Sequence, residues 1–184
     1  MLTEEPKVQI VECLFNALFD KSEKTILVSG AEEPLYLPSS SENEYNQIFS
    51  TSDYFSSALH EISHWCVAGA TRRKLIDYGY WYEPDGRSEK QQLLFEQVEV
   101  KPQAMEWIFT VAAGQKFRLS VDNINQPEIK PSDEFKLNVT NQAQRYLLKG
   151  LPDRAQIFLQ ALLNEFKVDS TEIACDKFVL SSLD

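Results

Sequence analysis

The chain has 184 residues, of which 43% are hydrophobic and 25% charged, and its formal net charge is −10. A chain of this length can bury a core without disulfides or a structural metal. It has neither a run of about 20 apolar residues that would span a bilayer nor a basic N-terminal export signal, so we expect a cytoplasmic protein with no membrane segment. The negative charge disfavours direct nucleic-acid binding and favours a cationic partner or a lysine-bearing substrate.

The first part of the chain alternates helix and strand patterns. Apolar residues at a spacing of 3.6 predict an amphipathic helix over residues 6–20. Three short β-type runs follow at residues 25–29, 35–37 and 45–51, separated by turn-forming segments. Ser52 or Asp53 is a suitable N-cap for a helix that we expect to run to about Ile76.

The second part is mainly helical. Ser88 starts a helix in which Pro102 predicts either a kink or an end near Val100 with a fresh start. A strand is expected over residues 116–121, and two helices over residues 132–149 and 152–166, with Gly150 between them. No composition break divides the chain, so we expect one domain over residues 1–184 of the α+β class. Its four strand candidates should form a small mixed sheet packed by helices.

The sequence His60-Glu61-Ile62-Ser63-His64 is an H-E-x-x-H motif in a helical setting, and it holds the only two histidines of the chain. A spacing of four places both imidazoles on one helix face, where two nitrogens can bind one divalent metal ion. The opposite face of this helix is apolar and should lie against the sheet, with Cys66 buried there. The alternative is a pair of core or surface histidines with no ligand.

A metal held by two imidazoles needs at least one more ligand, usually a carboxylate. The helix after Ser88 offers Glu96 and Glu99, and its periodicity does not choose between them. The alternative for this stripe is a solvated acidic face. The polar stripe comprises Gln92, Glu96, Glu99, Gln103 and Glu106.

The aromatic run over residues 78–82 is followed by Glu83 and Asp85. Aromatic faces beside carboxylates bind cationic amines. We expect Tyr80, Trp81, Tyr82 and Asp85 to receive a cationic substrate at the entrance to the metal. The alternative is an aromatic patch of the core followed by a turn.

Several of these stretches together resemble the elongation factor P hydroxylase family, over residues 33 to about 123. The matching stretches are Glu33-Pro34-Leu35-Tyr36-Leu37-Pro38, Tyr54, Ser57-Ala58-Leu59-His60-Glu61-Ile62-Ser63-His64-Trp65-Cys66, Tyr78-Gly79-Tyr80-Trp81-Tyr82, Pro84-Asp85-Gly86-Arg87, Phe95-Glu96, Val98-Glu99-Val100-Lys101-Pro102-Gln103-Ala104 and Ala112-Ala113-Gly114.

The resemblance implies a non-haem iron site with His60, His64 and Glu99 as ligands, Fe(II) as the metal and dioxygen as co-substrate. It implies elongation factor P as the partner, with hydroxylation of a lysine that already carries a β-lysyl group. The sequence has no H-x-D motif followed by a distant histidine, so dependence on 2-oxoglutarate is not implied. Glu61 is then a catalytic residue that orients a histidine, a water or dioxygen rather than a hydrolytic base.

The competing hypothesis is a zinc hydrolase, either a peptidase or a nuclease-like phosphoesterase. In such an enzyme Glu61 is the general base and Glu99 fits equally well as the third ligand. The motif alone does not separate the two. The lack of an export signal argues against the peptidase and the net charge of −10 against the nuclease. A purely structural metal is disfavoured because such sites usually have four protein ligands.

Overall fold

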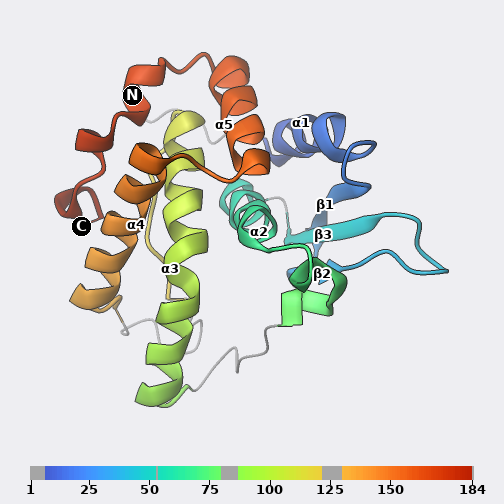
Figure 1. The fold of residues 1–184 in the computed structure, drawn as a ribbon, viewed down its shortest axis with the longest axis horizontal. Helices are drawn as coiled ribbons and strands as arrows, with labels where there is room; N and C mark the ends of the chain where they lie inside the picture. Colours follow the sequence, from blue (N-terminus) through green and yellow to red (C-terminus); the bar gives the residue numbers. More distant parts are fainter. Residues whose placement is uncertain (1–6, 53, 80–86, 122–129, 184) are drawn as a thin grey trace. The chain divides into compact units, whose positions relative to one another are not determined.

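The computed structural model describes residues 7–52, 54–79, 87–121 and 130–183, which belong to two compact units, residues 1–80 and 81–184 (Figure 1). Each unit is described by itself. In the described parts of the chain, no helix has the length and apolar character needed to cross a membrane. The elements of the first unit are α1 (Val8–Phe19), β1 (Thr25–Ala31), β2 (Leu35–Leu37), β3 (Asn46–Thr51), α2 (Phe55–Val67), η1 (Arg72–Lys74) and η2 (Ile76–Gly79), and those of the second are α3 (Glu89–Ala112), α4 (Asp133–Lys149), α5 (Asp153–Phe166), η3 (Ser170–Ile173), η4 (Cys175–Lys177) and η5 (Leu180–Leu183).

The sheet of the first unit has the order β1-β3-β2, with β1 parallel and β2 antiparallel to β3. Ile48 lies opposite Leu27 on one side and Tyr36 on the other, so the three side chains share one face of the sheet. All three are buried. Helix α2 contacts β3 and β1, and α1 contacts β1 and α2. The expected α+β class, the small mixed sheet and the packing of the histidine helix against it are confirmed.

The outer edge of β1 is covered by side chains of α1. The Asn16 amide accepts a hydrogen bond from Leu27 N at 2.7 Å and donates one to Leu27 O at 3.1 Å. The Glu12 carboxylate accepts from both the backbone N–H and the hydroxyl of Ser29. These contacts satisfy backbone groups that an edge strand otherwise exposes.

Three aromatic rings pack α1 against α2. Phe15 and Phe19 each meet Trp65 edge-on, with ring centroids 5.1 and 4.9 Å apart. All three rings are almost fully buried, and together they remove a large apolar area from water. This cluster fixes α2 from its apolar side, so the polar side that carries the histidines faces away from the core.

The predicted bounds of the histidine helix are wrong at both ends. Its N-cap is Tyr54 rather than Ser52, with no side-chain cap hydrogen bond, while Asp53 lies outside the described residues. The helix ends at Val67 instead of near Ile76, because the backbone turns extended at Ala68. Farther along, Asp77 and Tyr78 adopt left-handed φ values of 46° and 58°, which a helix cannot include.

In the second unit α3 packs against α4 and α5. Ser88 forms the expected N-terminal cap, accepting from Gln91 N, and α4 is followed by Gly150 with a φ of 97°. Helix α3 runs without a break through Pro102, so a helix end near Val100 is wrong.

The strand expected over residues 116–121 is also wrong, because this segment has no regular secondary structure. It is held instead by Gln103, whose amide accepts from Ser120 N at 3.0 Å and donates to Ser120 O at 2.8 Å. Phe117 and Val121 are buried. Phe117 stacks on Trp107 of α3, and the sheet has three described strands rather than four.

Candidate metal centre

The two histidines of the H-E-x-x-H motif lie on the outer side of α2. Phe55, Ala58 and Ile62 of the same helix are buried, whereas His60 and His64 are partly exposed. The Nε2 atoms of the two imidazoles are 3.1 Å apart. The helix therefore presents two ring nitrogens to one point, as the spacing predicts.

This separation fits a shared metal ion. Two nitrogens bound at about 2.1 Å with an angle of about 90–110° at the ion lie roughly 3.0–3.4 Å apart. The observed Nε2–Nε2 distance of 3.1 Å falls in that interval. The two Nε2 atoms are therefore spaced to bind one ion, with α2 in the conformation observed.

The position of α2 is fixed next to the strand that precedes it. Thr51, the last residue of β3, donates its backbone N–H to Ser57 Oγ at 3.0 Å. Ser57 lies in the first turn of α2, one turn before His60. The hydrogen bond ties the start of the histidine helix to the central strand.

In the second unit Glu96 serves the start of α4. Its carboxylate accepts a hydrogen bond from Ser132 Oγ at 2.6 Å, and the same Oγ accepts from Phe135 N at 3.0 Å as the N-cap of α4. A carboxylate beside a helix N-terminus is stabilised by the helix dipole. Glu96 is therefore engaged in fixing α4 to α3.

Glu99 is 1% exposed and lies one turn before Gln103 on α3. Gln103 Nε2 is 3.3 Å from Glu99 Oε2, and the Gln103 amide is itself held by the Ser120 backbone. Glu96, Gln103 and Glu106 are also buried. The alternative of a solvated acidic face is therefore wrong. Glu99 belongs to the second unit, and its binding of the same metal ion as the two histidines therefore stays a prediction.

Tyr78 lies beside the histidine helix, a position that the sequence pattern did not reveal. Its ring stacks on Tyr36 at 4.3 Å and lies parallel to the His64 ring, with centroids 6.3 Å apart. Burial and the nearby Glu61 carboxylate raise the pKa of Tyr78 well above 10. Its hydroxyl is therefore protonated at neutral pH. Glu61 itself is partly exposed on α2.

Comparison with known proteins identifies the family of this chain. The family model of elongation factor P hydroxylases matches residues 14–178. The chain belongs to this family. A relative from Haemophilus influenzae, the elongation factor P lysine hydroxylase, is 50% identical over 161 residues, which cover 86% of this chain and 89% of the relative.

Membership in the elongation factor P hydroxylase family decides between the two hypotheses for the motif. The match begins within α1 and ends beyond α5, so it includes the H-E-x-x-H helix and the helix that carries Glu99. A hydrolase with Glu61 as general base is not favoured.

The substrate-binding residues expected from the sequence, Tyr80, Trp81, Tyr82 and Asp85, lie outside the described residues. Their assignment therefore stays a prediction.

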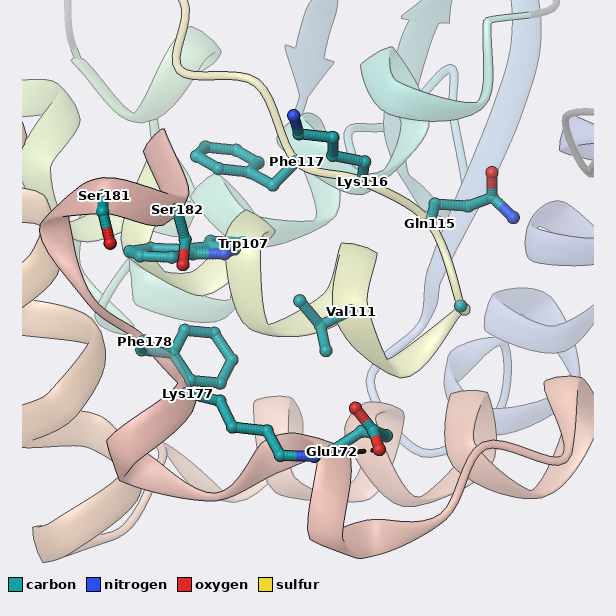
Figure 2. A pocket seen from close by; sticks show the side chains of 11 residues that line it. Trp107, Val111, Gln115, Lys116, Phe117, Glu172, Lys177, Phe178, Ser181 and Ser182 are labelled. Atoms are coloured by element: carbon teal, nitrogen blue, oxygen red, sulfur yellow. Dashed lines mark ion pairs between the residues drawn. The ribbon is translucent and has the colours of Figure 1, made fainter. Parts of the chain in front are cut away.

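A separate hollow of about 520 Å³ lies in the second unit of this hydroxylase (Figure 2). Trp107, Phe117 and Phe178 line it, and an ion pair of 2.8 Å between Lys177 and Glu172 lies at its side. Among the predicted site residues of the second unit that the structure describes, Glu99 does not line this hollow.

Proposed function

We propose that this chain hydroxylates a lysine side chain of elongation factor P in a metal-dependent reaction. The observation that carries the proposal is the pair of imidazole nitrogens 3.1 Å apart on α2, in a chain of the elongation factor P hydroxylase family. The substrate follows from the name of the Haemophilus influenzae relative, at 50% identity.

His60, His64 and Glu99 hold the metal, which is Fe(II). Two imidazoles and one carboxylate are the donor set of non-haem iron oxygenases, in which the remaining positions stay open. The ion would supply the activation of dioxygen, the co-substrate, of which one oxygen atom enters a C–H bond and the other leaves as water with two electrons from an external reductant. Glu99 is preferred to Glu96 because the Glu96 carboxylate accepts the hydrogen bond from the N-cap residue of α4. Gln103, fixed to the Ser120 backbone, orients the Glu99 carboxylate.

Glu61 supports the site without binding the metal. It lies between the two histidines on α2 and is partly exposed, so its carboxylate can orient an imidazole or a water molecule. In a hydroxylase it does not have to activate water for hydrolysis.

The substrate lysine already carries a β-lysyl group, and its ammonium charge is bound by Tyr80, Trp81, Tyr82 and Asp85. Aromatic faces contribute about 0.5–2 kcal/mol for each cation–π contact, and a carboxylate adds direct charge pairing. The net charge of −10 favours the approach of a cationic side chain. The two units act as one functional domain, and the reaction takes place in the cytoplasm, where translation factors work.

The test combines metal analysis with mass spectrometry. Protein purified without oxygen is analysed for iron and zinc, then incubated in air with β-lysylated elongation factor P and a reductant. We expect iron near one equivalent and a mass increase of one oxygen atom, about 16 Da, on the modified peptide. Unmodified elongation factor P and metal-free protein are the controls. Zinc as the active metal, or peptide hydrolysis instead of oxygen insertion, would refute the proposal.

A further inference from the structure

The hydroxyl group of Tyr78 is buried and accepts or donates no hydrogen bond within the part of the chain that the structure describes. The side chain is only 4% exposed. A buried polar group without a partner lowers the stability of a fold, whereas phenylalanine in the same place would not. The neighbouring Tyr36 differs in this respect, because its hydroxyl donates to Arg73 O at 2.8 Å.

The backbone that carries Tyr78 is also strained. Asp77 and Tyr78 have φ values of 46° and 58°, a region that side chains with a Cβ rarely adopt. Two hydrogen bonds of 2.8 Å hold this conformation, from Tyr36 N to Asp77 Oδ1 and from Arg72 Nη1 to Tyr78 O. Strain that surrounding contacts maintain is typical of functional sites.

These contacts place the phenol beside the histidine pair. The Tyr78 ring stacks on Tyr36, with ring centroids 4.3 Å apart, and lies parallel to the His64 ring, with centroids 6.3 Å apart. A phenol hydroxyl can donate one hydrogen bond. It is therefore available as a hydrogen-bond donor and needs an acceptor atom.

We propose that the Tyr78 hydroxyl is a catalytic hydrogen-bond donor whose acceptor is an oxygen atom of a molecule that binds at the histidine pair during the reaction. Two sources of that oxygen fit the proposed function on which this inference rests. One is dioxygen, and the other is the amide carbonyl that joins the β-lysyl group to the substrate lysine. Either oxygen would accept the hydrogen bond that the Tyr78 hydroxyl does not make within the described part of the chain.

The test compares Tyr78→Phe with its matched control, Tyr36→Phe, in the full-length protein. Thermal unfolding is measured on metal-free protein, so this readout does not depend on iron or activity. We expect Tyr78→Phe to raise the melting temperature by about 2–6 °C, because a buried hydroxyl without a partner is removed. Tyr36→Phe should lower it, because the hydrogen bond to Arg73 O is lost.

Steady-state hydroxylation of β-lysylated elongation factor P is then measured with iron-loaded protein of equal metal content. We expect kcat/KM of Tyr78→Phe to fall by about a hundredfold, the lower end of the loss known for removing one donor to a reacting oxygen. A fall carried by KM for elongation factor P identifies the amide carbonyl as acceptor. A fall carried by kcat at saturating protein substrate identifies dioxygen.

A melting temperature that is unchanged or lower in Tyr78→Phe would show that the hydroxyl has a partner in the chain, and would overturn the inference. So would a higher melting temperature with unchanged kcat and KM. Failure of the proposed function can be told apart from failure of this inference. In that case the enzyme without any substitution would already leave β-lysylated elongation factor P unchanged.

Discussion

Glu96 and Glu99 lie three residues apart on α3 and are both buried, yet their surroundings differ. The Glu96 carboxylate receives the hydroxyl of Ser132 and so takes part in capping α4. Glu99 is contacted by Gln103, which is anchored on the backbone at Ser120. The hydrogen bond from Ser132 thus gives buried Glu96 a structural role, whereas the surroundings of Glu99 are compatible with metal binding.

Replacing each glutamate by alanine should separate structure from chemistry. Glu99→Ala should lose bound iron and all measurable hydroxylation, with the folded state retained. Glu96→Ala should keep iron but lower the free energy of unfolding by about 1–3 kcal/mol, because Ser132 and the start of α4 lose a charged acceptor. Metal analysis and urea denaturation measure the two effects. Loss of iron in Glu96→Ala together with full iron in Glu99→Ala would contradict the ligand assignment.

Glu61→Gln tests the role of the central carboxylate. The variant should keep its iron and an appreciable share of hydroxylation, because the amide retains the size and an acceptor oxygen of the carboxylate. The measurement is the rate of oxygen incorporation at equal metal content, with His60→Ala as the inactive control. Complete loss of activity with iron intact would give Glu61 an obligatory proton-transfer role instead.

At the scale of the elements, side-chain amides form hydrogen bonds with backbone groups that lack a neighbouring strand. Asn16 of α1 binds both backbone groups of Leu27, and Gln103 of α3 binds both backbone groups of Ser120. Each amide supplies one donor and one acceptor in the geometry of a strand neighbour. The first closes the edge of β1, and the second holds a segment that would otherwise need a strand partner.

Asn16→Leu should therefore lower the free energy of unfolding more than substitutions at partly exposed positions usually do. Leucine leaves the N–H and C=O of Leu27 without their partners, and we expect the free energy of unfolding to fall by about 2–4 kcal/mol. Chemical denaturation measures this, and Gln9→Leu, at an exposed position of the same helix, is the control with an expected change below about 0.5 kcal/mol. Equal stability of the two variants would mean that solvent replaces the amide at the β1 edge.

The same contacts explain how far periodicity can predict the elements. Strand β2 has the predicted bounds, and α1, α4 and α5 agree within two residues. Helix α4 agrees because Ser132 caps its start and Gly150 follows its end. Residues 116–121 alternate like a strand, but whether a strand forms depends on a partner, and Gln103 provides the backbone contacts instead. The end of α2 was missed because Leu75 and Ile76 continue an apolar pattern although they are exposed.

At the scale of the whole chain, the local part of the site could be predicted and the long-range part could not. His60 and His64 share one helix, so their spacing alone brings the Nε2 atoms within 3.1 Å. Tyr78 depends on a stack with Tyr36, which is 42 positions earlier, and on a left-handed backbone that no propensity of Asp77 or Tyr78 would indicate. Glu99 was selected by resemblance and not by periodicity.

The proposed substrate residues Tyr80, Trp81, Tyr82 and Asp85 lie in the sequence around position 80, where the first unit ends and the second begins. Asp85→Asn or Trp81→Ala should raise KM for β-lysylated elongation factor P several-fold with unchanged iron content, because a charge pair or a cation–π contact is lost. The check is steady-state kinetics on the modified and the unmodified factor. Identical KM values for both variants and the parent protein would assign this stretch to an aromatic patch and a turn.

The middle strand of the sheet is the last of the three in the chain, and this governs when the first unit can assemble. In the described structure β1 and β2 each pair with β3 alone. During translation both outer strands are synthesised before residues 46–51, and neither has a strand to pair with until those residues follow. Helix α2 begins at Phe55, directly after that strand. A nascent chain therefore has no three-stranded sheet against which the apolar side of α2 can pack until residues 46–51 have been synthesised.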